Sequence, residues 1–168
     1  MLVKKNSLLA STLFIFALAA CSKSETKSAA DPHAGHDHSV LKHEHVPPHG
    51  GTAIVLGEEA YHLEIVRDDA AGKLSLYVMD GELENFVRIT APSLEIVVTI
   101  AGQPTPLVLR PVANSLTGEK PGDTSVFEVA ADWLKTTPNF DAVLTRIEVR
   151  TTAFTAVAFN FPKGNEKG

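Results

Sequence analysis

The chain has 168 residues, 44% of them hydrophobic, with 20 acidic and 15 basic side chains and a formal net charge of −5. This length suits one domain of ordinary size built around a single core. The acidic balance argues against nucleic acid or an anionic membrane surface as a partner, because both require basic patches. It favours the attraction of cations.

The N-terminus is organised like an export signal. Two lysines precede the apolar run LLASTLFIFALAA, residues 8–20. As a helix this run would span about 20 Å, against the roughly 30 Å of a bilayer core. We therefore expect residues 1–20 to be a cleaved signal peptide and not a permanent anchor. Its removal takes away two lysines and no acid, so the net charge moves from −5 to −7.

The end of the apolar run, Leu18-Ala19-Ala20-Cys21, resembles the lipobox of bacterial lipoproteins. The resemblance implies cleavage before Cys21, acylation of that cysteine, and a lipid anchor on the periplasmic side of the cell envelope. Ser22 follows, where lipoproteins retained in the inner membrane usually carry Asp, so the outer membrane is favoured. An ordinary secreted protein is the alternative. An acylated Cys21 leaves no thiol for a disulfide or a thiolate metal site.

A histidine-rich segment separates the signal from the rest of the chain. Residues 21–48 hold too few apolar side chains to offset the entropy of ordering, so we expect a lipidated, flexible tether. Two His-x-His pairs, 36/38 and 43/45, would each place both imidazoles on one side of an extended chain.

Clustered imidazoles indicate a capacity to bind metal. Neutral imidazole is the commonest ligand of divalent transition metals, so we expect reversible binding of Zn, Cu, Ni or Co, with no metal required for folding. A solvating spacer with incidental histidines is the alternative. The candidate ligands are His33, His36, His38, His43, His45, His49, His62 and Glu64.

Residues 49–164 show apolar side chains at every second position, broken by turn residues. This pattern predicts an all-β domain, an antiparallel immunoglobulin-like β-sandwich of about eight strands after a disordered His-rich tail. Trp133, in the one expected helical turn at 131–136, should close one end of the core. The expected strands are residues 53–56, 60–68, 73–80, 93–100, 105–112, 125–130, 142–150 and 152–161.

The first expected hairpin makes a more specific prediction. If residues 56–60 form its turn, Val55 faces His62 and Ala53 faces Glu64, on the outer side of the sheet. His49 comes just before this hairpin, so the three polar side chains could form a selective metal site at the joint with the tail. A solvated strand face with no metal is the alternative reading.

The run HEHVPPHGGTAIVLGEEAYHLEIVRD resembles the N-terminal segments of periplasmic adaptor proteins of heavy-metal efflux systems and of small lipoproteins found with them. The resemblance spans roughly residues 33–80. It implies metal capture or delivery in the periplasm, with a metal-efflux complex as partner. The long helical hairpin and lipoyl-like halves of an adaptor are missing, which favours an accessory binding module. The matched positions are His43, His45, His49 and His62.

Catalytic motifs do not stand out. The chain has no Gly-x-Ser-x-Gly elbow and no Gly-x-x-x-x-Gly-Lys phosphate loop, and every histidine precedes residue 63. The sequence therefore indicates a binding protein and not an enzyme. The alternative function is a structural or protein-interaction lipoprotein whose His-rich segment is only a spacer.

Overall fold

The computed structural model describes residues 46–166; the predicted lipidation at Cys21 and the tail histidines up to His45 lie outside this range. Within it, the predicted all-β, antiparallel class with eight strands is confirmed, and the strand ends agree with prediction to within two residues. No helix among the described residues is long and apolar enough to span a membrane. The elements are β1 (Thr52–Leu56), β2 (Tyr61–Asp68), β3 (Lys73–Asp80), β4 (Leu94–Ile100), β5 (Gln103–Pro111), β6 (Val126–Ala130), the 3-10 turn η1 (Asp132–Lys135), β7 (Phe140–Val149) and β8 (Thr152–Phe161).

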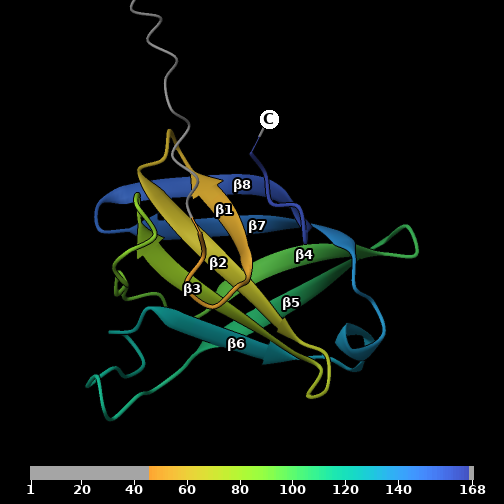
Figure 1. Cartoon of the computed structure of the whole chain (residues 1–168), viewed down its shortest axis with the longest axis horizontal. Helices are drawn as coiled ribbons and strands as arrows, with labels where there is room; N and C mark the ends of the chain where they lie inside the picture. The colour runs from red at the N-terminus through yellow and green to blue at the C-terminus, as the bar shows by residue number, and fades with distance from the viewer. Residues whose placement is uncertain (1–45, 167–168) are drawn as a thin grey trace, which may run out of the picture. The chain divides into compact units, whose positions relative to one another are not determined.

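The strands form one sheet in the order β1-β2-β3-β6-β5-β4-β7-β8, which curves until β1 and β8 approach each other (Figure 1). The two facing layers expected of a sandwich are therefore halves of a single, nearly closed sheet. Strand β5 connects them: it pairs with β4 along its length and with β6 only at Arg110 and Pro111.

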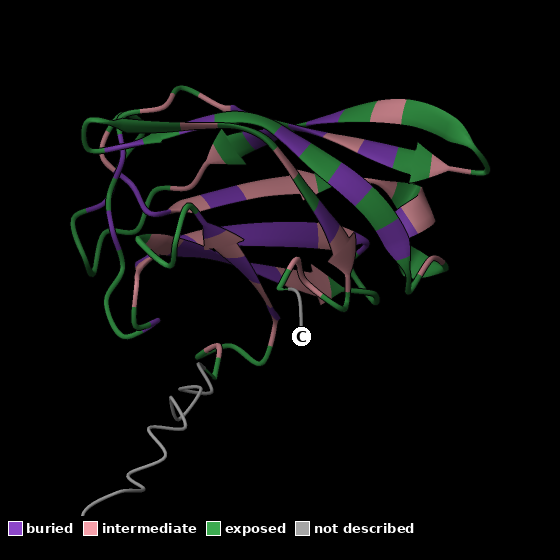
Figure 2. Ribbon diagram, turned by 90° about the horizontal axis from the view of Figure 1, so that it is seen from above, coloured by how far each residue is buried: buried purple, intermediate pink, exposed green. Residues whose placement is uncertain are grey.

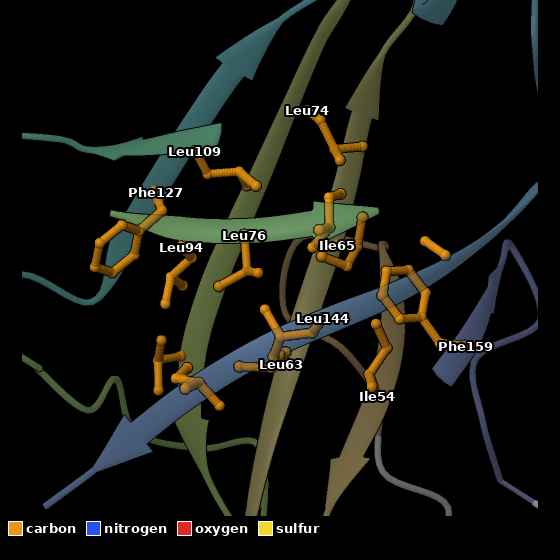
Figure 3. Close-up of a cluster of buried hydrophobic side chains, with 14 of the residues drawn as sticks. Ile54, Leu63, Ile65, Leu74, Leu76, Leu94, Leu109, Phe127, Leu144 and Phe159 are labelled. Atoms are coloured by element: carbon orange, nitrogen blue, oxygen red, sulfur yellow. The ribbon is translucent and has the colours of Figure 1, made fainter. Parts of the chain in front are cut away.

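Apolar side chains from both halves fill the space between them (Figure 3). Ile54 and Leu63 on one side meet Leu144 and Phe159 on the other, as the period-two pattern predicts. Burial of each such side chain contributes about 1.5–3 kcal/mol. Trp133 packs against the core, in keeping with its expected place, with its ring centroid 5.3 Å from that of Phe140.

The register of the first hairpin is the predicted one. Val55 pairs with His62 and Ala53 with Glu64, while Ile54 pairs with Leu63 on the core side. A slip of one residue would have turned the apolar set outward. His62 and Glu64 therefore do share the outer face of β2.

Residues after β8 bridge the remaining gap to β1. The Asn165 side-chain amide accepts a hydrogen bond from Val55 N–H at 2.8 Å and donates one to Val55 C=O at 3.0 Å, as a neighbouring strand would. Gly164 passes so close that an added Cβ would lie 2.5 Å from the Ala53 carbonyl oxygen. This segment thus covers the edge of β1, which would otherwise expose unpaired backbone groups.

We expect Asn165→Ala to lower the free energy of unfolding by about 1–2 kcal/mol, because both polar backbone groups of Val55 lose their partner. Urea denaturation measures the change. Lys163→Ala, at an exposed position in the same segment, is the control and should leave the midpoint unchanged. Equal midpoints for Asn165→Ala and the wild type would show that the Asn165 amide does not stabilise the contact between this segment and β1.

Candidate functional site

The segment Pro47–Gly51 folds into a turn against the outer face of β2. Gly50 N–H donates to Pro47 C=O at 3.0 Å, with Pro48 at the second turn position, where its fixed φ is favourable. Gly50 has a φ of +67°, which suits glycine. A Cβ on Gly51 would lie 2.5 Å from the Ile65 carbonyl oxygen, so the PPHGG residues fix the path of the chain along β2.

The turn surrounds the buried carboxylate of Glu64, which is 0% exposed. Its Oε1 accepts hydrogen bonds from the backbone N–H groups of His49 at 2.8 Å and Gly51 at 2.9 Å. Its Oε2 lies 2.7 Å from Nδ1 of His49. Backbone N–H groups that converge around a left-handed glycine form a favourable site for an anion. The turn therefore satisfies a carboxylate that would be costly to bury alone.

This contact also orients the His49 ring. An ionised carboxylate only accepts hydrogen bonds, so Nδ1 is the ring nitrogen that donates to Glu64, and in the neutral ring the lone pair is then on Nε2. Ligating histidines commonly donate their second ring N–H to a carboxylate in this way, which fixes the tautomer and the ring orientation. The His49 side chain remains 36% exposed, so the ring is oriented but accessible.

Two aromatic side chains complete the surroundings of His49. Its ring stacks on Tyr77, with centroids 4.0 Å apart and planes 14° apart, and lies 5.7 Å from the tilted ring of Phe86. Phe86 is held there because its loop returns along β3, where Val87 N–H donates to Val78 C=O at 2.9 Å. The Tyr77 ring, on the outer face of β3, is thus partly covered by the rings of His49 and Phe86.

His62, two residues before Glu64 on β2, is also buried. It is 1% exposed, and its Nδ1 lies 3.4 Å from the Asp80 carbonyl oxygen. The structure therefore brings His49 and Glu64 together, and it places His62 and Glu64 on a covered face instead of a solvated one. Residues 46–166 contain no group of three or more His, Cys, Asp or Glu side chains arranged to hold a metal ion. The remaining predicted ligands, His33, His36, His38, His43 and His45, lie outside the described residues.

An open cavity of about 370 Å³ adjoins the His49 ring. Two carboxylates, Glu119 and Glu128, belong to its wall, whereas none of its lining residues is Lys or Arg. The described residues that line it are His49, Tyr77, Phe86, Val112, Ala113, Asn114, Thr117, Glu119, Ser125, Val126 and Glu128.

Glu119 is a buried charge held by neutral donors. The Ser125 backbone N–H and hydroxyl donate to its Oε1 at 2.8 and 2.6 Å, and the Thr117 hydroxyl donates to Oε2 at 2.7 Å. Burial alone would raise the pKa of Glu119, but these hydrogen bonds, with a smaller contribution from the charge of Arg88, outweigh burial and hold the pKa below its usual range. Glu119 therefore carries its negative charge at neutral pH.

Glu128 is the second carboxylate of the wall. Its Oε1 accepts hydrogen bonds from Lys73 at 2.8 Å and from the Ser75 hydroxyl at 2.9 Å. The hydrogen bond with Glu128 raises the pKa of Lys73. Burial, with a smaller contribution from the charge of Glu128, raises the pKa of the Tyr77 phenol, so that ring stays neutral.

Apart from His49, the cavity residues were not singled out from the sequence. Tyr77 and Glu128 each lie between apolar residues of a strand. This alternation predicts that their side chains point away from the core, but not what they contact. Their meeting depends on the pairing of β3 with β6, across about fifty residues of chain. No local pattern predicts that pairing.

Comparison with protein families, with curated proteins and with solved structures finds no match for this chain. The interpretation of the site therefore rests on its geometry and chemistry.

Glu119 should make the stability of the domain depend on pH. Because its pKa is lowered on folding, its stabilising effect is present above the ordinary value near 4.5 and is lost as the pH falls through the lower value of the folded state. Glu119→Gln should be less stable than the wild type at pH 7, and the difference should shrink below about pH 4.5. Urea denaturation from pH 7 to pH 3 measures both curves. Glu58→Gln, at an exposed turn position, should follow the wild-type curve, and a constant difference between Glu119→Gln and the wild type would contradict the prediction.

Proposed function

We propose that this protein is a lipid-anchored lipoprotein of the periplasm that binds divalent transition metals through its histidine-rich segment and His49. The observation that carries the proposal is the pairing of the His49 ring with the buried Glu64 carboxylate. With Nδ1 donating to Glu64, Nε2 of the neutral ring is free to bind a metal ion from a side chain that is 36% exposed, directly after a segment rich in imidazoles.

In this proposal His49 is the fixed ligand and the preceding histidines complete the set. His45 and His43 stand four and six residues before it, and an extended chain covers about 3.3 Å per residue, so both can return to a metal on Nε2. A ligand that is already oriented lowers the entropic cost of assembling the others. Glu64 acts through His49, and His62 supports the end of the β2–β3 hairpin at Asp80.

The donor set favours borderline divalent ions. With Cys21 acylated, the ligands are nitrogen and oxygen atoms, which suit Zn, Cu(II), Ni or Co. The one thioether of the mature chain belongs to Met79, which is fully buried. Soft Cu(I) is therefore disfavoured. A protein of this kind would capture or buffer metal beside the membrane, as an accessory to metal efflux or homeostasis.

Calorimetric titration of the fragment Ser22–Gly168 with Zn²⁺, Cu²⁺ and Ni²⁺ tests the proposal, since this fragment keeps every described strand. We expect micromolar or tighter binding in the wild type and its loss in a His43, His45, His49 triple-alanine variant. Glu64→Gln should weaken binding about 10- to 100-fold, the usual cost of losing a partner that orients a ligand. Binding should also fall below about pH 6, where protonated imidazoles cannot ligate.

A His33, His36 double-alanine variant is the control, because it removes two imidazoles and keeps His43, His45 and His49. It should lose much less affinity than the triple variant. His62→Gln should bind metal like the wild type if His62 only supports the hairpin. Weak binding that is indifferent to all of these substitutions would refute the proposed function.

Lipidation is tested separately by expressing the whole chain in a Gram-negative host with labelled palmitate. The wild type should incorporate label and sediment with membranes, because Cys21 would receive the acyl chains. Cys21→Ser should incorporate none and should retain its signal peptide. Ser22→Ala is the matched control and should still be labelled; label on Cys21→Ser would exclude this anchor.

A further inference from the structure

We propose that the cavity beside His49 receives the cationic side chain of a Lys or Arg from a partner protein. This proposal goes beyond the proposed metal binding and stands whether or not a metal binds. The proposal rests on three features of the cavity: an aromatic corner, an acidic wall, and apolar side chains exposed at its margin.

Three rings form the aromatic corner. Tyr77 and Phe86 have centroids 6.0 Å apart with planes 47° apart, and His49 lies 4.0 Å from the first and 5.7 Å from the second. His49 and Tyr77 are stacked and cover one face of each other, so the angle that is open to a cation lies between this stack and the tilted ring of Phe86. Phe86 is 50% exposed, so its ring is accessible to a ligand from outside.

The acidic wall, Glu119 and Glu128, makes the electrostatic potential of the cavity favourable for a cation. Both hydrogen bonds on Glu128 end at Oε1, which leaves Oε2 available to a ligand. Glu119 forms no ion pair within the described residues: its hydrogen-bond donors are Ser125 and Thr117, and the nearby Arg88, whose charge also acts on Glu119, pairs with Asp123. Lys73 pairs with Glu128 but does not line the cavity, so the two carboxylates of the wall would attract an entering cation.

The remaining lining suits the stem of a long side chain. Val112, Ala113 and Val126 contribute apolar surface. The methylene groups of Lys or Arg pack on such surface while the charged end reaches polar groups. A volume of about 370 Å³ lies at the small end of the range for ligand sites.

Exposed apolar side chains favour a protein over a small free cation. Leu116 is 95% exposed and lies in the turn between Asn114 and Thr117, two residues of the cavity wall. With Phe86 it presents apolar surface at the margin of an acidic pocket. Protein interfaces commonly combine a buried anchor in a pocket with apolar contacts around it. The partner segment should therefore carry Lys or Arg beside apolar residues.

The experiment titrates ¹⁵N-labelled Ser22–Gly168 with three acetylated, amidated tripeptides, Leu-Arg-Leu, Leu-Lys-Leu and Leu-norleucine-Leu, and with n-butylammonium. EDTA is present, so the result is independent of metal binding. We expect the cationic peptides to shift amide signals of the cavity residues and to bind at least about fivefold tighter than the norleucine peptide. They should also bind about tenfold tighter than n-butylammonium, which lacks the apolar flanks.

Two substitutions and two matched controls locate the site. Glu128→Gln removes the charge and keeps the shape, and Phe86→Ala truncates an exposed ring; each should weaken the cationic peptides about threefold or more. Glu148→Gln removes an exposed carboxylate that also pairs with a basic side chain, Arg146, and Val108→Ala truncates an exposed apolar residue elsewhere. Both controls should bind like the wild type, and dispersed spectra will show that all four variants fold.

Each contrary result overturns a part of the proposal. If the norleucine peptide bound as tightly as the cationic peptides, the site would not recognise charge. If n-butylammonium bound as tightly as the peptides, the ligand would be a small cation and not a partner protein. Shifts elsewhere on the domain, equal losses in Glu128→Gln and Glu148→Gln, or no shifts up to about 10 mM peptide would refute the site.

Discussion

A carboxylate buried on the outer face of β2 sets the arrangement of this end of the molecule. Glu64 is fully buried, and a buried charge is tolerated only when it is hydrogen-bonded. The donors come from the turn before β1: two backbone N–H groups and the Nδ1 of His49. Satisfying Glu64 thus draws residues 47–51 over the sheet, places the His49 ring on Tyr77, and forms one wall of the adjoining cavity.

The nearly closed sheet explains why the two halves of the domain differ. Strands β4 and β7 alternate between buried and exposed residues, as expected when one face meets solvent, whereas β2 and β3 carry consecutive buried residues (Figure 2). In β2 and β3 the second face is covered by the N-terminal turn and by the loop that carries Phe86. The covered face is where polar side chains such as Glu64 and Ser75 are held in place, and it is therefore the face suited to a binding site.

Local patterns predicted the features that depend on neighbouring residues. Alternation predicted the strands, and the turn length predicted the pairing of Val55 with His62, because these two residues are only seven positions apart in the chain. The meeting of Glu128 with Ser75 was not predictable, since the cavity needs β3 to pair with β6. The burial of His62 and Glu64 was missed for a related reason: a strand pattern shows which face a residue occupies, but not what covers that face.

The two proposed ligands share one imidazole, which has an energetic consequence. A divalent ion on Nε2 of His49 would add positive charge to the wall of a cavity that attracts cations through Glu119 and Glu128. Occupancy of one site would therefore weaken the other, and by linkage the effect must be equal in both directions. Such coupling would make release of a basic partner depend on metal. It would arise from charge alone, without movement of the sheet, because the ring is already fixed by Glu64 and Tyr77.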